Sequence, residues 1–383
     1  MSKSFRFLSA VLAISLLLGA VQLGAVRTAA APNTVTAISY ADTTSDPGYY
    51  LIGNNKIEFK ISKTNGYISS IYNKSLAKNF KSETAGVWPF GIRVGNSWKA
   101  ADITVDSPSE ISGVNVSYPD SSSVKLAVNY NNLKYNGDGT YSGVSAAVEY
   151  TVADNDEYVN FNVTLHNNSP YQIDTMILCA HGLSASNNHV NETLACPAWD
   201  SGYLFKNPVG NSKFDTTKYL AYPGPGLNLL NNQDSLQEAW LDLYASDTNG
   251  GIGIAYIDKS KYPMEFWMHR NYPNAMNMAP VFFDPTSILS CNNTGHPMPS
   301  TALAAGASFT TDDVIIAPHS GDWHTMADIY RTEYQKVMVN SDGSPDYLTW
   351  DQISPKVKSA DYVASVMSAL QNALYTQLTH KKK

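Results

Sequence analysis

The chain has 383 residues and a formal net charge of −7, from 26 basic and 33 acidic residues. Proteins that bind nucleic acid need clustered Lys and Arg, so this balance argues against a nucleic-acid partner. The three cysteines are too few for a disulfide-built scaffold, although Cys179 and Cys196 could pair, and a large hydrophobic core must hold the fold instead.

Residues 1–31 have the pattern of a secretory signal. Lys3 and Arg6 precede an apolar run from Phe7 to Ala20, and three alanines at 29–31 form a small-residue cleavage site. The apolar run is too short for a permanent transmembrane helix, and no later stretch is long enough to span a bilayer. We therefore predict a secreted bacterial protein, extracellular or at the cell surface, with no membrane span and a linker over 32–48.

From residue 49 to 318, apolar and polar residues alternate with period two between turn signals, which is typical of strands. Ile57, Phe59 and Ile61 alternate, a turn follows at 64–66, and residues 67–72 return as the second strand of a hairpin. Further strands are predicted at 91–94, 103–106, 124–130, 144–152, 158–166, 173–180, 239–245, 251–257, 264–269, 281–283 and 309–316. Since no helices alternate with these strands, the pattern predicts a mainly β, antiparallel sandwich.

Between Ala185 and Gln237 the alternation breaks down into Asn, Gly, Pro and aromatic residues, which indicates a long loop region. Long loops inside a compact domain tend to be functional. An indole stacks on the apolar face of a pyranose, while Asp, Asn and Arg bond the sugar hydroxyls. The predicted substrate-binding residues of this kind are Trp199, Asp200, Trp240, Trp267 and Arg270. Trp240 and Trp267 fall on predicted strands, where a position in the core is the alternative.

A helix is predicted after the last strand. Asp322 is a good N-cap, and Met326, Ile329 and Tyr330 recur at helical spacing, within 319–339. His319 and His324 lie close in sequence, but only Asp322 could complete a metal site and its capping role explains it, so we predict no metal and no cofactor. A breaker cluster at 340–345 precedes a second amphipathic pattern over 362–378, which predicts a C-terminal helical segment over 340–383.

Three segments carry a resemblance to a known family: Asn55–Ile71, Trp240–Tyr256 and His319–Tyr334. They resemble hairpins and the strand-to-helix junction of a secreted bacterial glycoside hydrolase family. In that family a galactose-mutarotase-like β-supersandwich precedes a catalytic (β/α)8 barrel. The resemblance implies an antiparallel β-supersandwich (galactose mutarotase-like) over 49–318 with C-terminal helices, the first of them a linker helix over 319–339.

The same resemblance implies a carbohydrate-associated N-terminal domain of a secreted glycoside hydrolase. A barrel needs roughly 250 residues, and about fifty follow Tyr334, so we expect a truncated chain that lacks the barrel. The catalytic residues of the family lie on barrel strands, so none is carried onto this sequence. The implied partners are an oligo- or polysaccharide and a catalytic barrel domain encoded downstream.

Two other functions stay open. Aldose mutarotases use a carboxylate base and histidine acids, and His181 and His189 are the candidates for such histidines in a sugar epimerase or lyase on the same fold. The segment Asn188–Asn191 resembles a mutarotase motif but lacks its aromatic residue. A non-catalytic extracellular carbohydrate-binding or interaction module is the other alternative. An epimerase predicts a histidine that faces a carboxylate, and a truncated hydrolase predicts an exposed apolar face along the C-terminal helices.

Overall fold

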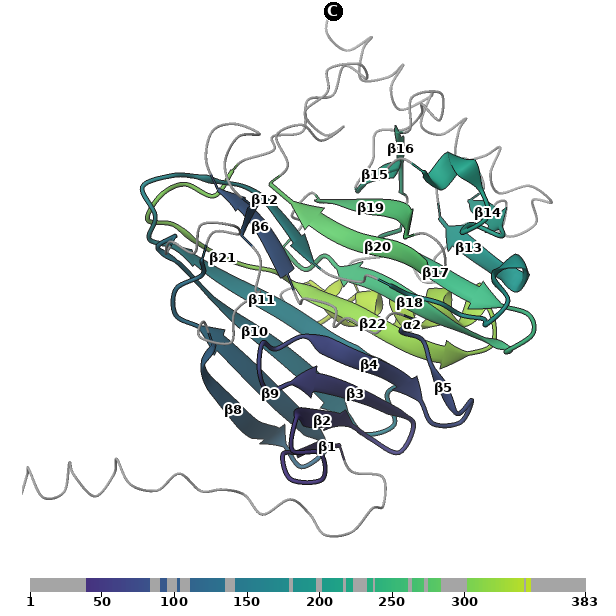
Figure 1. Ribbon diagram of the computed structural model, residues 1–383, viewed down its shortest axis with the longest axis horizontal. Helices are drawn as coiled ribbons and strands as arrows, with labels where there is room; N and C mark the ends of the chain where they lie inside the picture. The colour runs from purple at the N-terminus through teal and green to yellow at the C-terminus, as the bar shows by residue number, and fades with distance from the viewer. Residues whose placement is uncertain are drawn as a thin grey trace, which may run out of the picture.

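In the computed structural model of the chain, three antiparallel sheets and one α-helix make up most of the described residues (Figure 1). The mainly β, antiparallel prediction is confirmed, and among the described strands only β15 and β16 pair in parallel. The predicted signal (1–31) and the second helical pattern (362–378) lie outside the described residues. The structure describes residues 39–82, 90–94, 102–103, 111–134, 142–178, 182–197, 202–215, 218–222, 233–236, 238–260, 264–271, 275–283, 302–340 and 342–345.

The first sheet has five strands in chain order. They are β1 (Tyr40–Asp42), β2 (Tyr49–Gly53), β3 (Ile57–Ser62), β4 (Ile68–Asn73) and β5 (Lys78–Asn79). The predicted hairpin is confirmed as β3 and β4, and Gly66 supplies the positive φ of +73° that its turn requires. β1 pairs with β2 inside the segment predicted as a linker, so the sheet starts before residue 49 because Ala41 is buried opposite Ile52.

The next sheet has ten strands, and its part around β9 and β10 lies behind the first sheet in Figure 1. Its order is β14-β13-β17-β18-β22-β11-β10-β9-β8, with β21 paired to β11. Strand β10 is alternately buried and half-exposed over its whole length, which is the signature of a sheet with one covered face. The strands are β8 (Ile111–Asp120), β9 (Ser123–Tyr130), β10 (Val144–Ala153), β11 (Val159–Asn167), β13 (Glu192–Cys196), β14 (Tyr203–Lys206), β17 (Trp240–Ala245), β18 (Gly250–Ile257), β21 (Ser308–Thr310) and β22 (Asp313–Ser320).

The seven-stranded sheet has the order β16-β15-β19-β20-β12-β6-β7. Its strands are β6 (Phe90–Val94), β7 (Asp102–Ile103), β12 (Ile173–Leu178), β15 (Lys218–Tyr222), β16 (Gln233–Ser235), β19 (Met264–Asn271) and β20 (Ala275–Phe282). The prediction of a long loop over 185–237 is wrong, because β13 to β16 all lie there. All five residues of β13 are buried, so this strand shows no alternation, and the other three have only three to five residues each.

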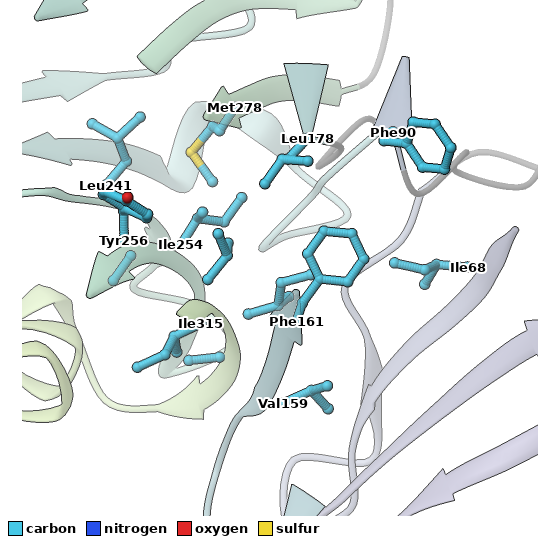
Figure 2. Packing of buried hydrophobic residues seen from close by; sticks show 14 of the residues in the cluster. Ile68, Phe90, Val159, Phe161, Leu178, Leu241, Ile254, Tyr256, Met278 and Ile315 are labelled. Atoms are coloured by element: carbon cyan, nitrogen blue, oxygen red, sulfur yellow. The ribbon is translucent and has the colours of Figure 1, made fainter. Parts of the chain in front are cut away.

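The hydrophobic core lies between the sheets, as Figure 2 shows. Phe161 of β11, Ile254 of β18 and Ile315 of β22 face Leu178 of β12 and Met278 of β20. All five are at most 1% exposed. Burial of each side chain of this kind contributes about 1.5–3 kcal/mol, so the core contributes strongly to holding the long sheets together.

Helix α2 (Trp323–Val337) covers β17, β18 and β22. The Asp322 side chain accepts a hydrogen bond from the His324 backbone N–H at 3.1 Å, as an N-cap does, so the prediction of this helix start is confirmed. A Cβ at Gly253 on β18 would lie 2.1 Å from Sδ of Met326, so only glycine lets the helix approach this closely. No helix in the described part of the chain is both long and apolar enough to cross a bilayer.

We expect Gly253→Ala to lower the free energy of unfolding by about 1–3 kcal/mol, because the added methyl group pushes Met326 and α2 away from the sheet. Urea denaturation measures the change. Gly113→Ala is the matched control, since a Cβ at Gly113 on the edge strand β8 meets nothing within 4 Å. Equal stability of the two variants would contradict the close packing of α2.

Candidate functional site

One face of the seven-stranded sheet packs on the core, and the opposite face carries polar and aromatic side chains. On β19, Phe266 and Met268 belong to the core and are at most 2% exposed. Because successive residues of a strand point to opposite faces, Glu265, Trp267 and His269 share the other face. We call this surface the Trp267 face.

Neighbouring strands add to the Trp267 face through their register. On β20, Ala279 lies opposite Trp267 and Asn277 lies opposite His269. On β12, Met176 and Leu178 are core residues, so Thr175 points to the polar face. Its buried Oγ1 has no hydrogen-bond partner among the described residues, and a buried hydroxyl of this kind calls for a ligand or a water.

Glu265 and Trp267 form a linked pair. The indole Nε1–H donates to Oε1 of Glu265 at 2.6 Å, and Glu265 is 1% exposed while Trp267 is half-buried. This bond fixes the orientation of the ring and of the carboxylate. The pair therefore places a half-buried aromatic ring beside a buried carboxylate on this face.

His269 is oriented by an amide relay. Oδ1 of Asn277 accepts from the Gly182 N–H at 2.8 Å, which leaves the Asn277 Nδ2 to donate to Nε2 of His269 at 2.8 Å. We assign the ring proton to Nδ1 on this basis. Burial lowers the pKa of His269, so the ring is neutral at neutral pH. The Trp267 face thus presents a carboxylate, an indole and a neutral imidazole along one strand.

Arg270, predicted to bind substrate, ties β19 to a neighbouring loop. Its Nη1 donates to the Val209 carbonyl at 2.8 Å, and its Nη2 forms an ion pair with Asp215. These contacts hold the short 3-10 turn Ser212–Phe214 beside β19. Arg270 therefore supports the segment next to the Trp267 face.

Trp240 lies beneath α2, away from the β19 strand. It is 3% exposed, its Nε1–H donates to Glu238 at 2.7 Å, and its ring stacks on Trp323 at a centroid distance of 6.3 Å and an interplanar angle of 9°. Trp240 is therefore a core residue, which was the alternative to sugar binding for a Trp on a predicted strand. Three other predicted site residues lie outside the described residues, namely Trp199, Asp200 and His181.

His189 does face a carboxylate. Its Nδ1 is 3.0 Å from Oε2 of Glu192, whose side chain is 0% exposed. The other oxygen of Glu192 accepts from the backbone N–H groups of Ala185 and Ser186 at 2.7 and 3.0 Å. The pair therefore pins the loop 184–192.

Sequence reasoning found Trp267 but missed Glu265, His269, Asn277 and Thr175. A signal for the first two was available, because a Trp on a strand with a Glu and a His two residues away on either side places all three on one face. Asn277 on β20, beside β19, and Thr175 on β12, two strands from β19, carry no such signal, since their position on this face depends on long-range strand pairing.

A second histidine–carboxylate pair is fully buried. Nε2 of His319 on β22 is 3.0 Å from Oδ1 of Asp242 on β17, and both side chains are 0% exposed. A Cβ at Gly251 would lie 2.9 Å from the His319 ring, so glycine makes room for it. Burial opposes the charged form, but the charge of Asp242 and hydrogen bonds to Asp242 and the Ser320 carbonyl raise the pKa of His319 overall. Because both side chains are fully buried, this pair has a structural role.

The raised pKa of His319 predicts a pH-dependent stability. Relative to the ordinary value of 6.5, the folded state holds the proton more tightly than the unfolded state. The stabilisation is therefore complete below pH 6.5 and is lost as pH rises through the folded pKa. We expect His319→Gln to reduce the free energy of unfolding most in mildly acidic buffer, by about 3–5 kcal/mol because it leaves Asp242 without its charged partner, and less at alkaline pH.

Urea denaturation from mildly acidic to alkaline pH measures the difference in the free energy of unfolding between wild type and His319→Gln. The variant His324→Gln is the control, since the His324 ring is exposed, pairs with the exposed Asp322 and stacks on Trp323. A difference between wild type and His319→Gln that does not change with pH would show that the proton on His319 is not part of the interaction.

Comparison with known proteins gives structural likenesses only. No protein-family model matches the chain, and no curated protein matches its sequence. Among solved structures, the GH36 alpha-galactosidase AgaB from Geobacillus stearothermophilus is similar with a TM-score of 0.48 at 10% identity, over 79% of this chain and 44% of that chain. A galactose mutarotase related enzyme from Lactobacillus acidophilus gives 0.39 at 12% identity, over 71% and 97%.

A TPR-domain containing protein from Parabacteroides distasonis gives a TM-score of 0.40 at 11% identity, over 75% of this chain and 53% of that chain. The chain thus spans about half the length of this protein and less than half of the alpha-galactosidase. These similar structures include a galactose mutarotase related enzyme and a GH36 alpha-galactosidase. They correspond to the mutarotase-like and glycoside hydrolase parts of the resemblance seen in the sequence. With TM-scores below 0.5, none of their activities is carried to this chain.

Proposed function

We propose that this chain is an exported carbohydrate-associated domain that binds an oligo- or polysaccharide at the Trp267 face. The observation that carries the proposal is the Trp267 indole, oriented by Glu265 and flanked on the same face by His269. A pyranose offers an apolar face of C–H groups to such a ring and hydroxyl groups to the polar side chains around it. The domain itself is proposed to be non-catalytic.

The Trp267 face has the donors and acceptors that a sugar needs. Its polar side chains include the Glu265 carboxylate and the neutral imidazole of His269, and polar groups of this kind fix the orientation of a ligand in binding sites. The unpartnered Thr175 hydroxyl both donates and accepts.

The proposed partners are the glycan and a catalytic barrel domain. The barrel rests on the sequence resemblance of the strand-to-helix junction His319–Tyr334 to a glycoside hydrolase family. Helix α2, which follows that junction, is capped and packed against the sheet, so it offers a rigid connection to a following domain.

A sugar epimerase or lyase is the second candidate, and one observation favours it. A carboxylate and a neutral imidazole, the groups used as base and acid on a sugar, lie on either side of Trp267. Glu265 and His269 are four residues apart on β19, so their Cα atoms lie roughly 13 Å apart. Both side chains must therefore lean toward Trp267 to contact opposite sides of one sugar ring. Turnover of a free sugar that is lost in both Glu265→Gln and His269→Gln would favour this candidate.

We expect Trp267→Ala to weaken oligosaccharide binding by about 1–3 kcal/mol through the loss of the stacked ring. Isothermal titration calorimetry with neutral oligosaccharides measures the affinity of the full chain. Trp267→Phe keeps an aromatic plane and is expected to retain part of the affinity, while losing the hydrogen bond to Glu265. Trp240→Phe is the matched control, because Trp240 is buried under α2 and its replacement should leave binding unchanged in a folded protein.

If Trp267→Ala stays folded and its affinity for every tested glycan equals that of wild type, the Trp267 face is not the binding site. Circular dichroism at the temperature of the titration establishes that the variant is folded.

Export gives a separate prediction. We propose that the segment 1–31 directs secretion, on the basis of its basic start, its apolar run and its small-residue end. N-terminal sequencing of the protein from culture medium should begin between Ala25 and Asn33. A cell-associated protein that keeps Met1 would refute the proposal.

A further inference from the structure

Six strands lie at the ends of the three sheets, and five of them are very short. Among the described residues, β1 and β16 have three residues each, β5 and β7 have two each, and β14 has four. An edge strand presents a row of unpaired N–H and C=O groups to which another strand can add, and a short edge limits such pairing. β8 is the exception, because it has ten residues.

The outer edge of β8 is open. In the described part of the chain β8 pairs only with β9, and in Figure 1 it is the outermost strand at its end of the ten-stranded sheet. A Cβ added at Gly113 would meet nothing within 4 Å. The register with β9 shifts between Ile111 and Gly113 and again between Ser117 and Asp120. A further strand would therefore pair with the regular stretch Gly113–Ser117.

The regular stretch has no charged residue and no proline, the residue types that protect many natural edge strands. Val114 and Val116 lie opposite Val128 and Leu126, which are both buried. The two valines are themselves half-buried, as expected at the rim of a sheet, and they pack against the core. Asn115 lies between them and is exposed. This edge thus offers an apolar row on its covered side and nothing that repels a second strand.

The stretch is also close to symmetric about Asn115. If two copies pair antiparallel with Asn115 opposite itself, each Val114 lies opposite Val116 of the other copy, and Gly113 lies opposite Ser117. Pairs of β-branched side chains directly opposite each other stabilise antiparallel strands. Two copies of a chain with a net charge of −7 repel each other, and an uncharged edge is where they can approach most closely. A second copy of this chain therefore fits the edge.

We propose that β8 is a homodimer interface, in which two copies pair antiparallel through Gly113–Ser117 across a two-fold axis at Asn115. A contact of this kind uses the same surface on both copies. The main-chain hydrogen bonds supply affinity, and the alternate side chains, here the facing valines, supply specificity. The two ten-stranded sheets then form one continuous sheet. This interface lies on a different sheet from the Trp267 face and does not depend on the function proposed for that face.

Sedimentation equilibrium of the full chain, up to high micromolar concentration, tests the proposal. We expect the wild-type chain to dimerise. Asn115→Lys places two like charges opposite each other at the axis, so it should raise the dimer dissociation constant about tenfold or more. Asn115→Glu should have the same effect. An equal mixture of the two variants should dimerise again, because a Lys then faces a Glu. Since Asn115 is exposed, both variants should fold, which circular dichroism checks.

Leu204→Lys is the matched control. Leu204 is 55% exposed and lies on β14, the short strand at the other end of the same sheet, so this variant should dimerise like wild type. Three results would overturn the proposal. One is a folded wild-type chain that stays monomeric at the highest concentration. Another is a dimer that Asn115→Lys does not weaken, or that Leu204→Lys weakens equally, since either places the contact elsewhere. The third is that the mixture of Asn115→Lys and Asn115→Glu stays monomeric, which would exclude two copies facing each other at Asn115.

Discussion

The pairing of β22 with two other strands is the constraint on which the rest of the structure depends. β22 pairs with β11 through residues 314–316 and with β18 along its whole length. Without it, the ten-stranded sheet would separate into β8 to β11 on one side and β13, β14, β17 and β18 on the other. Among the described strands of this sheet, β22 comes last in the sequence. It nevertheless joins strands from the two halves of the sheet, the earliest of which begins at Ile111.

The same strand sets the position of helix α2. At its end, His319 is locked against Asp242 within the sheet, and Gly321 then turns the chain with a φ of +89° into the cap at Asp322. Gly251 and Gly253 on β18 make room for His319 and for Met326 of the helix. A buried ion pair of this kind contributes less to net stability than to geometry, because desolvation of both charges offsets much of their attraction.

The three sheets differ in what their two faces contact, and the candidate binding surface follows from that difference. The five-stranded and seven-stranded sheets both place one face on the common core, so the opposite face of each is available for polar and aromatic side chains. On β19 that face carries the linked Glu265–Trp267 pair, and on β1 to β4 it carries tyrosines with lysines against their rings. Both outward faces thus arise because each sheet buries only one of its faces in the common core.

Part of this could be predicted from the sequence. Alternation located β3, β4, β9, β10 and β11, because each of these strands has one buried and one half-exposed face. It failed for β13, whose five residues are all buried, and for β8, whose register shifts twice. In the candidate site, Trp267 was identified from its residue type alone, whereas its neighbours Glu265, His269 and Asn277 were not.

By itself, the sequence determined that the chain is mainly β and antiparallel, where the hairpin at 57–72 lies, and where helix α2 begins. These features depend on local periodicity and on capping, which nearby residues specify. Only the tertiary structure decided which face of each strand is covered. Alternation assigns Phe266 and Trp267 to opposite faces of β19, but the core that buries Phe266 is built from strands far away in the chain. The side of β19 on which a ligand can bind is therefore a property of the packed sheets.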